Sequence, residues 1–181
     1  MRWFSPLFQT TLQLNANCKF QCLGCQLSSQ TSTGINQQSI LNIKPRQHVN
    51  LIGGSLEYHQ QSIEIIKFLA KKKCSLTLWS HHDFSNSWFL ELRPFISEWI
   101  IFCPAVSANE FNLIMGANAF SKFISTITQL PSPTLSFTIR SMNIDHLPEL
   151  HELAFNWIKR NCLILLYRQM YSCSSLVNSL G

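Results

Sequence analysis

The sequence has few acidic residues, no second Cys-x2-Cys pair and no long apolar run. The missing cysteine pair argues against a four-cysteine zinc site, and the missing apolar run argues against a membrane-spanning helix. Aspartate and glutamate number nine against fourteen lysines and arginines in 181 residues, so the formal charge of +5 arises as much from scarce acids as from abundant bases. The one basic run, Lys71–Lys73, is typical of a solvated helix end. Aromatic residues do not interleave with basic ones in any stretch, so we expect no nucleic-acid partner.

No apolar run approaches the length that crosses a bilayer, which excludes a membrane-spanning helix. The first fourteen residues are interrupted by polar side chains where a signal peptide would need an unbroken apolar stretch. These side chains are Ser5, Gln9, Thr10, Thr11 and Gln13. Seven cysteines, an odd number, are unlike a disulfide framework and fit a reducing compartment. We therefore expect a cytoplasmic protein without a membrane segment.

The composition is that of a folded domain, with 46% hydrophobic and 13% charged residues. A chain of 181 residues is long enough for one well-cored domain and too short for two ordinary ones. We expect a single domain over 1–181, with its core at about 8–168 and a polar tail at 169–181.

Three of the cysteines, Cys18, Cys22 and Cys25, stand in Cys-x3-Cys-x2-Cys spacing. Random placement of seven cysteines would give this triple in about one chain in a hundred. Three thiolates on one short loop suit zinc or iron held by sulfur. A structural zinc normally takes four protein ligands, so without a second cysteine pair it would need a histidine such as His48 or His59. A four-iron cluster held by three cysteines would leave one iron open for a substrate or cofactor.

Segments with the pattern of strands alternate along the chain with segments of helical periodicity. The expected strands cover 8–15, 49–52, 75–80, 99–102, 134–140 and 162–167, and the expected helices cover 37–43, 65–73, 88–96, 107–116, 120–130 and 147–158. Ser107 and Glu110 stand at capping-box spacing before the fourth helix. This alternation predicts an α/β fold with a parallel sheet and right-handed crossovers. Six such units form a partial barrel, with the chemistry at the carboxyl ends of the strands.

The cysteine triple, placed directly after the first strand, resembles the cluster motif of the radical S-adenosylmethionine (SAM) enzymes. NLIGGS at 50–55 occupies the place of that family's Gly-Gly-Glu-Pro turn, and SLTLWSHH at 75–82 the place of its strand-three segment. The stretch 111–130 resembles the family segment in which a glycine precedes a Phe-containing helix. The resemblance extends from Leu12 to about Tyr167. It implies the partial (β/α)6 TIM-like barrel of the radical SAM type.

The resemblance also implies the ligands of two cofactors. Cys18, Cys22 and Cys25 would bind a [4Fe-4S] cluster, and its fourth iron would take the amino and carboxyl groups of SAM. The residues that would contact SAM are Gly24, Gly53, Gly54, Ser55 and Ser80. Ser55-Leu56 stands where the family has Glu-Pro. This change removes a carboxylate near the SAM ammonium but leaves a hydroxyl and backbone carbonyls that can accept hydrogen bonds.

Two other positions differ from the family pattern. Gly24 precedes the third cysteine where an aromatic residue is common, so only its backbone could contact adenine, and a stacking surface would come from elsewhere, such as Phe20. Ser-His-His at 80–82 replaces the usual end of strand three, and a histidine pair in a loop is normally solvated. Met115 is most simply a core residue.

The resemblance implies an iron–sulfur enzyme that would reductively cleave SAM to methionine and a 5′-deoxyadenosyl radical, with the protein binding and orienting the reactants. No residue stands out as a catalytic acid or base. The electron would come from a reductant such as flavodoxin or ferredoxin. No cysteine group follows Cys25, so we expect no auxiliary iron–sulfur domain after the barrel. The polar tail after Tyr167 is too short to close a six-stranded barrel, so we expect an open side that a protein or peptide substrate, or a partner subunit, would cover. Two alternatives stay open: a non-catalytic radical SAM-like subunit or scaffold, and a small zinc-binding module.

Overall fold

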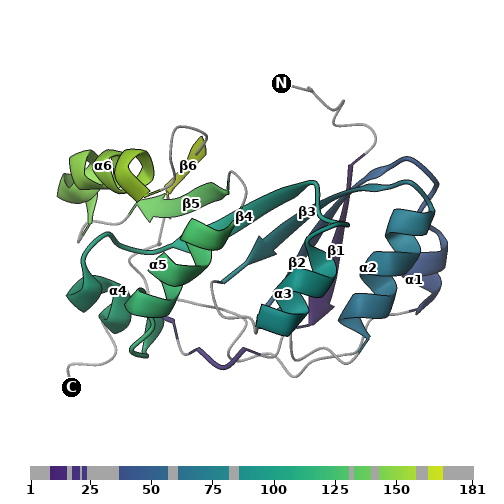
Figure 1. Ribbon diagram of the computed structural model, residues 1–181, viewed down its shortest axis with the longest axis horizontal. Coiled ribbons are helices and arrows are strands. Elements are labelled where there is room, and N and C mark those ends of the chain that lie inside the picture. The colour runs from purple at the N-terminus through teal and green to yellow at the C-terminus, as the bar shows by residue number, and fades with distance from the viewer. Residues whose placement is uncertain are drawn as a thin grey trace, which may run out of the picture.

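The computed structural model describes residues 9–15, 18–20, 22–23, 37–56, 61–81, 86–130, 133–139, 143–157 and 163–168. Within these residues, strands and helices alternate as the sequence predicts (Figure 1). The polar tail expected at 169–181 lies outside the described residues, and the single-domain prediction stays a prediction. Among the described residues, no helix has both the length and the apolar character needed to cross a membrane.

The described strands form one six-stranded parallel sheet in the order β1-β2-β3-β4-β5-β6. Its members are β1 (Gln9–Asn15), β2 (His48–Gly53), β3 (Ser75–Ser80), β4 (Glu98–Cys103), β5 (Thr134–Ile139) and β6 (Leu163–Arg168). Because each strand pairs with its neighbour in the sequence and right-handed crossovers are the rule, the connecting helices fall on one face of the sheet. This arrangement confirms the predicted α/β partial barrel.

The helices are α1 (Gln37–Leu41), α2 (Ser62–Lys71), α3 (Asn86–Leu92), α4 (Ala108–Met115), α5 (Phe120–Gln129) and α6 (Leu147–Trp157). In Figure 1, α2, α3 and α5 lie on the same face of the sheet. The Ser107 hydroxyl caps α4 by accepting a hydrogen bond from the Glu110 amide at 3.3 Å, as the capping-box spacing predicts. Gly116 caps the carboxyl end of α4, and its φ of 64° suits a residue without a side chain.

The two faces of the sheet differ in chemistry because side chains alternate along each strand. One face is apolar and fully buried against the helices, with Val49, Leu51, Leu76, Leu78, Ile101 and Phe137 at its centre. The opposite face carries polar side chains, including Asn50, Thr77, Glu98, Thr134 and Ser136. In β1 this polar face is exposed at Thr11 and Gln13. The sheet therefore has an apolar, buried side, which holds the fold together, and a mixed side, on which polar residues share the face with apolar ones such as Ile100 and Phe102.

Candidate functional site

The loop that carries the first two cysteines begins at the carboxyl end of β1. Asn15 pairs with Gly53 after an irregularity in the register between β1 and β2, so the loop starts beside the turn that ends β2. Its described residues, 18–20 and 22–23, are named the cysteine loop. Cys18 and Cys22 are both reduced thiols; Cys18 is half-buried and Cys22 is buried. Cys25 and Gly24 lie outside the described residues.

The first contact of the cysteine loop is with the turn after β2. The Ser55 hydroxyl lies 3.6 Å from Cys18 Sγ, and the backbone N–H of Lys19 donates to the same hydroxyl oxygen at 3.4 Å. Gly53 ends β2, and Gly54 follows it and is buried. The structure thus brings Cys18 together with the Gly-Gly-Ser turn, two features that the sequence places 37 residues apart.

The second contact of the cysteine loop is with the carboxyl end of α4, the helix that follows β4. The Cys22 thiol donates to Met115 Sδ at 3.6 Å, and the Leu23 N–H donates to the Ile114 carbonyl at 2.8 Å. Met115 is fully buried, as expected for a core residue, but no sequence pattern indicates that its thioether contacts a cysteine. These bonds hold the second cysteine against α4.

A third contact joins the middle of the cysteine loop to the end of β3. The ring of Phe20 lies 5.6 Å from the ring of His81, and His81 packs edge-on against Phe102 at 5.6 Å. Burial lowers the pKa of His81 from 6.5 to about 4, so its imidazole is neutral at neutral pH. Its Nδ1 is buried and makes no hydrogen bond with the part of the chain that the structure describes. His81 is half-buried and contacts two phenylalanine rings, so it is not the simply solvated residue that the sequence predicts; His82 lies outside the described residues.

Ser80, the remaining predicted SAM contact, is the last residue of β3 and is half-buried. It therefore lies at the same edge of the sheet as Gly53, which ends the neighbouring strand β2. The structure brings Ser80, Gly53, Gly54 and Ser55 to one edge, together with the cysteine loop. This is the carboxyl edge, where parallel α/β folds bind their ligands.

Zinc completed by His48 does not fit this arrangement. His48 begins β2, and five steps of about 3.3 Å place it roughly 17 Å from Gly53 at the other end of the strand. There its Nε2 lies 3.2 Å from the Thr77 hydroxyl. His48 therefore belongs to a polar cluster at the amino edge of the sheet, and the expectation that it could join the cysteines is wrong. His59 lies outside the described residues.

Two other cysteines lie away from the cysteine loop. The Cys74 thiol donates to the Lys44 carbonyl at 3.6 Å, just before the amino end of β3. Cys103 ends β4 on the helix-covered face, and its thiol donates to the Ala105 carbonyl at 3.5 Å. No group of three or more His, Cys, Asp or Glu side chains suited to a metal occurs within the described residues, which do not include Cys25. Cys162 and Cys173 also lie outside them.

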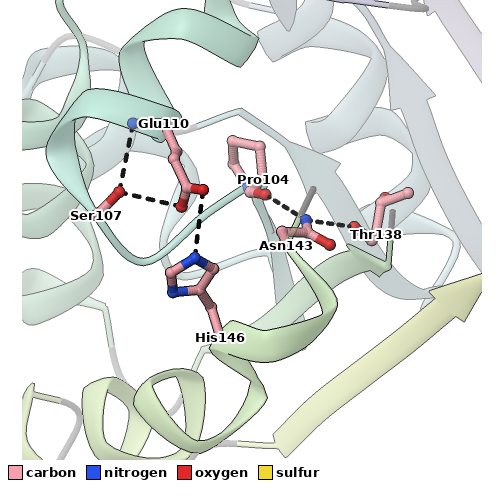
Figure 2. A network of polar contacts seen from close by, with 6 residues as sticks. All are labelled: Pro104, Ser107, Glu110, Thr138, Asn143 and His146. Carbon is pink, nitrogen blue, oxygen red and sulfur yellow. Dashed lines mark hydrogen bonds and ion pairs between the residues drawn. The ribbon is translucent and has the colours of Figure 1, made fainter. Parts of the chain in front are cut away.

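A polar network fixes the same edge of the sheet beyond β4 (Figure 2). The buried side-chain amide of Asn143 donates to the carbonyls of Pro104 and Thr138, both at 3.0 Å, and so joins the turn after β4 to the end of β5. Nearby, Glu110 accepts a hydrogen bond from the Ser107 hydroxyl at 3.1 Å and lies 3.3 Å from His146 Nε2. The capping-box spacing predicts the Ser107 contact, but no sequence pattern identifies Asn143.

Comparisons with known proteins identify the fold. No protein-family model matches the sequence, and no curated protein matches it. Streptococcus suis SuiB bound to S-adenosylmethionine is similar in structure, with a TM-score of 0.72 and 11% sequence identity over 91% of this chain and 42% of that chain. SuiB bound to its precursor peptide SuiA gives a TM-score of 0.72 and 11% identity over 88% and 39%. TYW1 with a lysine-pyruvate adduct bound gives a TM-score of 0.55 and 16% identity over 85% and 62%.

The present chain thus spans less than half the length of the SuiB chain. At identities of 11% and 16%, the similarity is one of fold. SuiB and TYW1 are radical SAM enzymes. The structural similarity therefore confirms the predicted resemblance to the radical SAM enzymes at the level of the fold, a partial TIM-like barrel with a parallel sheet.

Proposed function

We propose that this chain is a radical SAM enzyme that binds one [4Fe-4S] cluster through Cys18, Cys22 and Cys25 and reductively cleaves SAM. The observation that carries the proposal is the position of the cysteine loop, on the carboxyl edge of the sheet and in contact with the residues that follow β2, β3 and β4. The described donors fit the cluster, because Cys18 and Cys22 are reduced thiols and thiolates are the usual ligands of iron–sulfur centres. When bound, the cluster supplies the electron that cleaves SAM.

The residues around the cysteine loop have separate tasks in this proposal. Gly53 and Gly54 let the methionine part of SAM approach the backbone closely, and Ser55, Ser80 and the backbone of Gly24 add contacts to it. Backbone carbonyls and the Ser55 oxygen accept hydrogen bonds from the SAM ammonium in place of a glutamate.

Two further side chains of the proposed site are uncharged. The neutral imidazole of His81 adds no positive charge beside the cationic sulfonium of SAM. Met115 covers Cys22 with an apolar thioether and helps to keep water away from that sulfur.

The substrate that we propose is a protein or peptide. The polar face of the sheet is exposed at Thr11 and Gln13 in β1 and offers hydrogen-bonding groups to an extended partner. A similar fold in SuiB has been solved with a precursor peptide bound, which supports this substrate class.

The electron donor in this proposal is a small redox protein such as flavodoxin or ferredoxin. Leu23 directly follows Cys22 and is 49% exposed, so an apolar side chain at the surface adjoins a cluster ligand. Lys19 is exposed on the same loop, and the chain carries a net charge of +5, which favours an acidic partner.

The test of the proposed function is anaerobic reconstitution followed by iron, sulfide and zinc analysis. We expect about four irons per chain, the inventory of one [4Fe-4S] centre, and formation of 5′-deoxyadenosine from SAM with dithionite. Cys18→Ala and Cys22→Ala should lose the iron, whereas Cys74→Ala, at the opposite edge of the sheet, should keep it. One zinc per colourless chain would instead indicate the zinc-binding module.

A second candidate function is supported by one feature of the turn after β2. Ser55-Leu56 stands where radical SAM enzymes have Glu-Pro, so a carboxylate that would bind the SAM ammonium is replaced. The alternative is a non-catalytic radical SAM-like subunit or scaffold, with or without a cluster. A fully loaded protein that forms no 5′-deoxyadenosine under strong reduction would select this alternative.

A further inference from the structure

The hydroxyl of Ser55 contacts a predicted cluster ligand from outside the cysteine loop. Its oxygen lies 3.6 Å from Cys18 Sγ, within the range of a hydrogen bond to sulfur. Ser55 lies in the turn after β2 and is only 4% exposed, so the surrounding protein fixes its position. In the radical SAM pattern this position holds a glutamate, which has no proton to donate when ionised.

Ser55 and Cys18 can each be the donor of this hydrogen bond as long as Cys18 is a thiol. The Lys19 N–H, at 3.4 Å from the Ser55 oxygen, can only donate, so the hydroxyl is the acceptor in that contact. A cysteine that ligates a metal is a thiolate and has no proton, so the bond between Ser55 and Cys18 must then run from the hydroxyl to the sulfur.

We propose that Ser55 is a positioning residue that donates a hydrogen bond to the Cys18 thiolate and raises the reduction potential of the cluster; this inference rests on the proposed function. Reduction adds negative charge to an iron–sulfur centre, and hydrogen bonds to its sulfurs are among the factors that set its potential. The positive end of the Ser55 hydroxyl dipole stabilises the reduced form more than the oxidised form. A glutamate at this position would place a negative charge near the same sulfur and favour the oxidised form.

The test is a potentiometric titration of reconstituted protein, followed by electron paramagnetic resonance of the reduced cluster. Ser55→Ala removes the donor, and we expect a more negative midpoint potential. A tenfold rise in the oxidised-to-reduced ratio at fixed potential would correspond to about 59 mV for a one-electron couple. Ser55→Thr keeps a hydroxyl and should stay close to the wild type. Ser75→Ala is the matched control, because the Ser75 hydroxyl donates to Ser97 at the amino edge of the sheet.

A second measurement keeps the proposal testable where Ser55→Ala takes up too little iron. The iron–sulfur stretching bands in the resonance Raman spectrum of the wild type and of Ser55→Thr should shift when H2O is replaced by D2O, because the donated proton exchanges. Equal potentials for wild type and Ser55→Ala, or wild-type bands that do not respond to D2O, would overturn the role of Ser55 while the cluster itself stands. Wild-type protein that takes up no iron would overturn the proposed function, and this inference with it.

Discussion

Replacing Asn143 by alanine should lower the free energy of unfolding by about 3 kcal/mol, because it removes a side chain that joins two segments at the carboxyl edge of the sheet. Asn143 is only 1% exposed, and its amide donates two hydrogen bonds of 3.0 Å (Figure 2). Each such bond contributes about 1 kcal/mol net, and a buried carbonyl left without a donor costs about 1–3 kcal/mol. The Pro104 carbonyl is the acceptor in the fully buried bond, so most of the penalty should arise there.

The assay for this prediction is urea unfolding followed by circular dichroism, with thermal unfolding as a check. We expect a lower urea midpoint with an unchanged slope, and a melting temperature lower by roughly 6–12 °C for a chain of this size. Asn143→Asp keeps the shape but removes the amide donor, so it should be at least as destabilising. Asn118→Ala, at an exposed site, should cost under about 0.5 kcal/mol. A loss for Asn143→Ala no larger than that of Asn118→Ala, or an Asn143→Asp variant as stable as the wild type, would refute the role assigned to the Asn143 amide.

Three further predictions concern the cysteine loop and its surroundings. Gly54→Val should abolish 5′-deoxyadenosine formation while iron content stays at the wild-type level, because the new side chain fills the space for SAM; normal SAM cleavage would contradict this. Leu23→Ser should slow reduction by flavodoxin several-fold but not reduction by dithionite, and Leu90→Ser, 63% exposed elsewhere, should change neither rate. His81 keeps its neutral form down to a pH of about 4, whereas an unfolded chain protonates it near 6.5. Its contribution to stability should therefore be complete above pH 6.5 and fall between pH 6.5 and 4, and His81→Phe should show a smaller loss of urea midpoint over that window.

The fold could be predicted from the sequence because its signals are local. The alternating pattern predicts a strand at 75–80, and β3 occupies Ser75–Ser80. The capping box and the glycine predict a helix that begins after Ser107 and ends at Gly116, and both residues are the caps of α4. Alternation, capping residues and glycine act within a few residues of the backbone that they shape, so spacing along the chain is enough to locate them.

The side-chain contacts of the site could not be predicted in the same way. The positions of Cys18, Ser55 and His81 along the chain are plain in the sequence, and the strand order brings them to one edge. The sequence does not say that the Ser55 hydroxyl contacts a cysteine sulfur, or that His81 contacts both Phe20 and Phe102. Such contacts depend on strand register and on side-chain direction at the ends of different strands, which a local pattern does not contain.

The anchoring of the cysteine loop bears on how cysteine substitutions can be interpreted. Three of its contacts use groups other than the sulfurs: the Lys19 N–H to Ser55, the ring of Phe20 against His81, and the Leu23 N–H to the Ile114 carbonyl. These contacts come from the turns after β2 and β3 and from α4, so the loop is held by three neighbouring elements. An alanine at Cys18 or Cys22 removes a thiol but none of these contacts. Loss of iron in those variants would then report the missing ligand, because the loop that carries it should keep its place on the sheet.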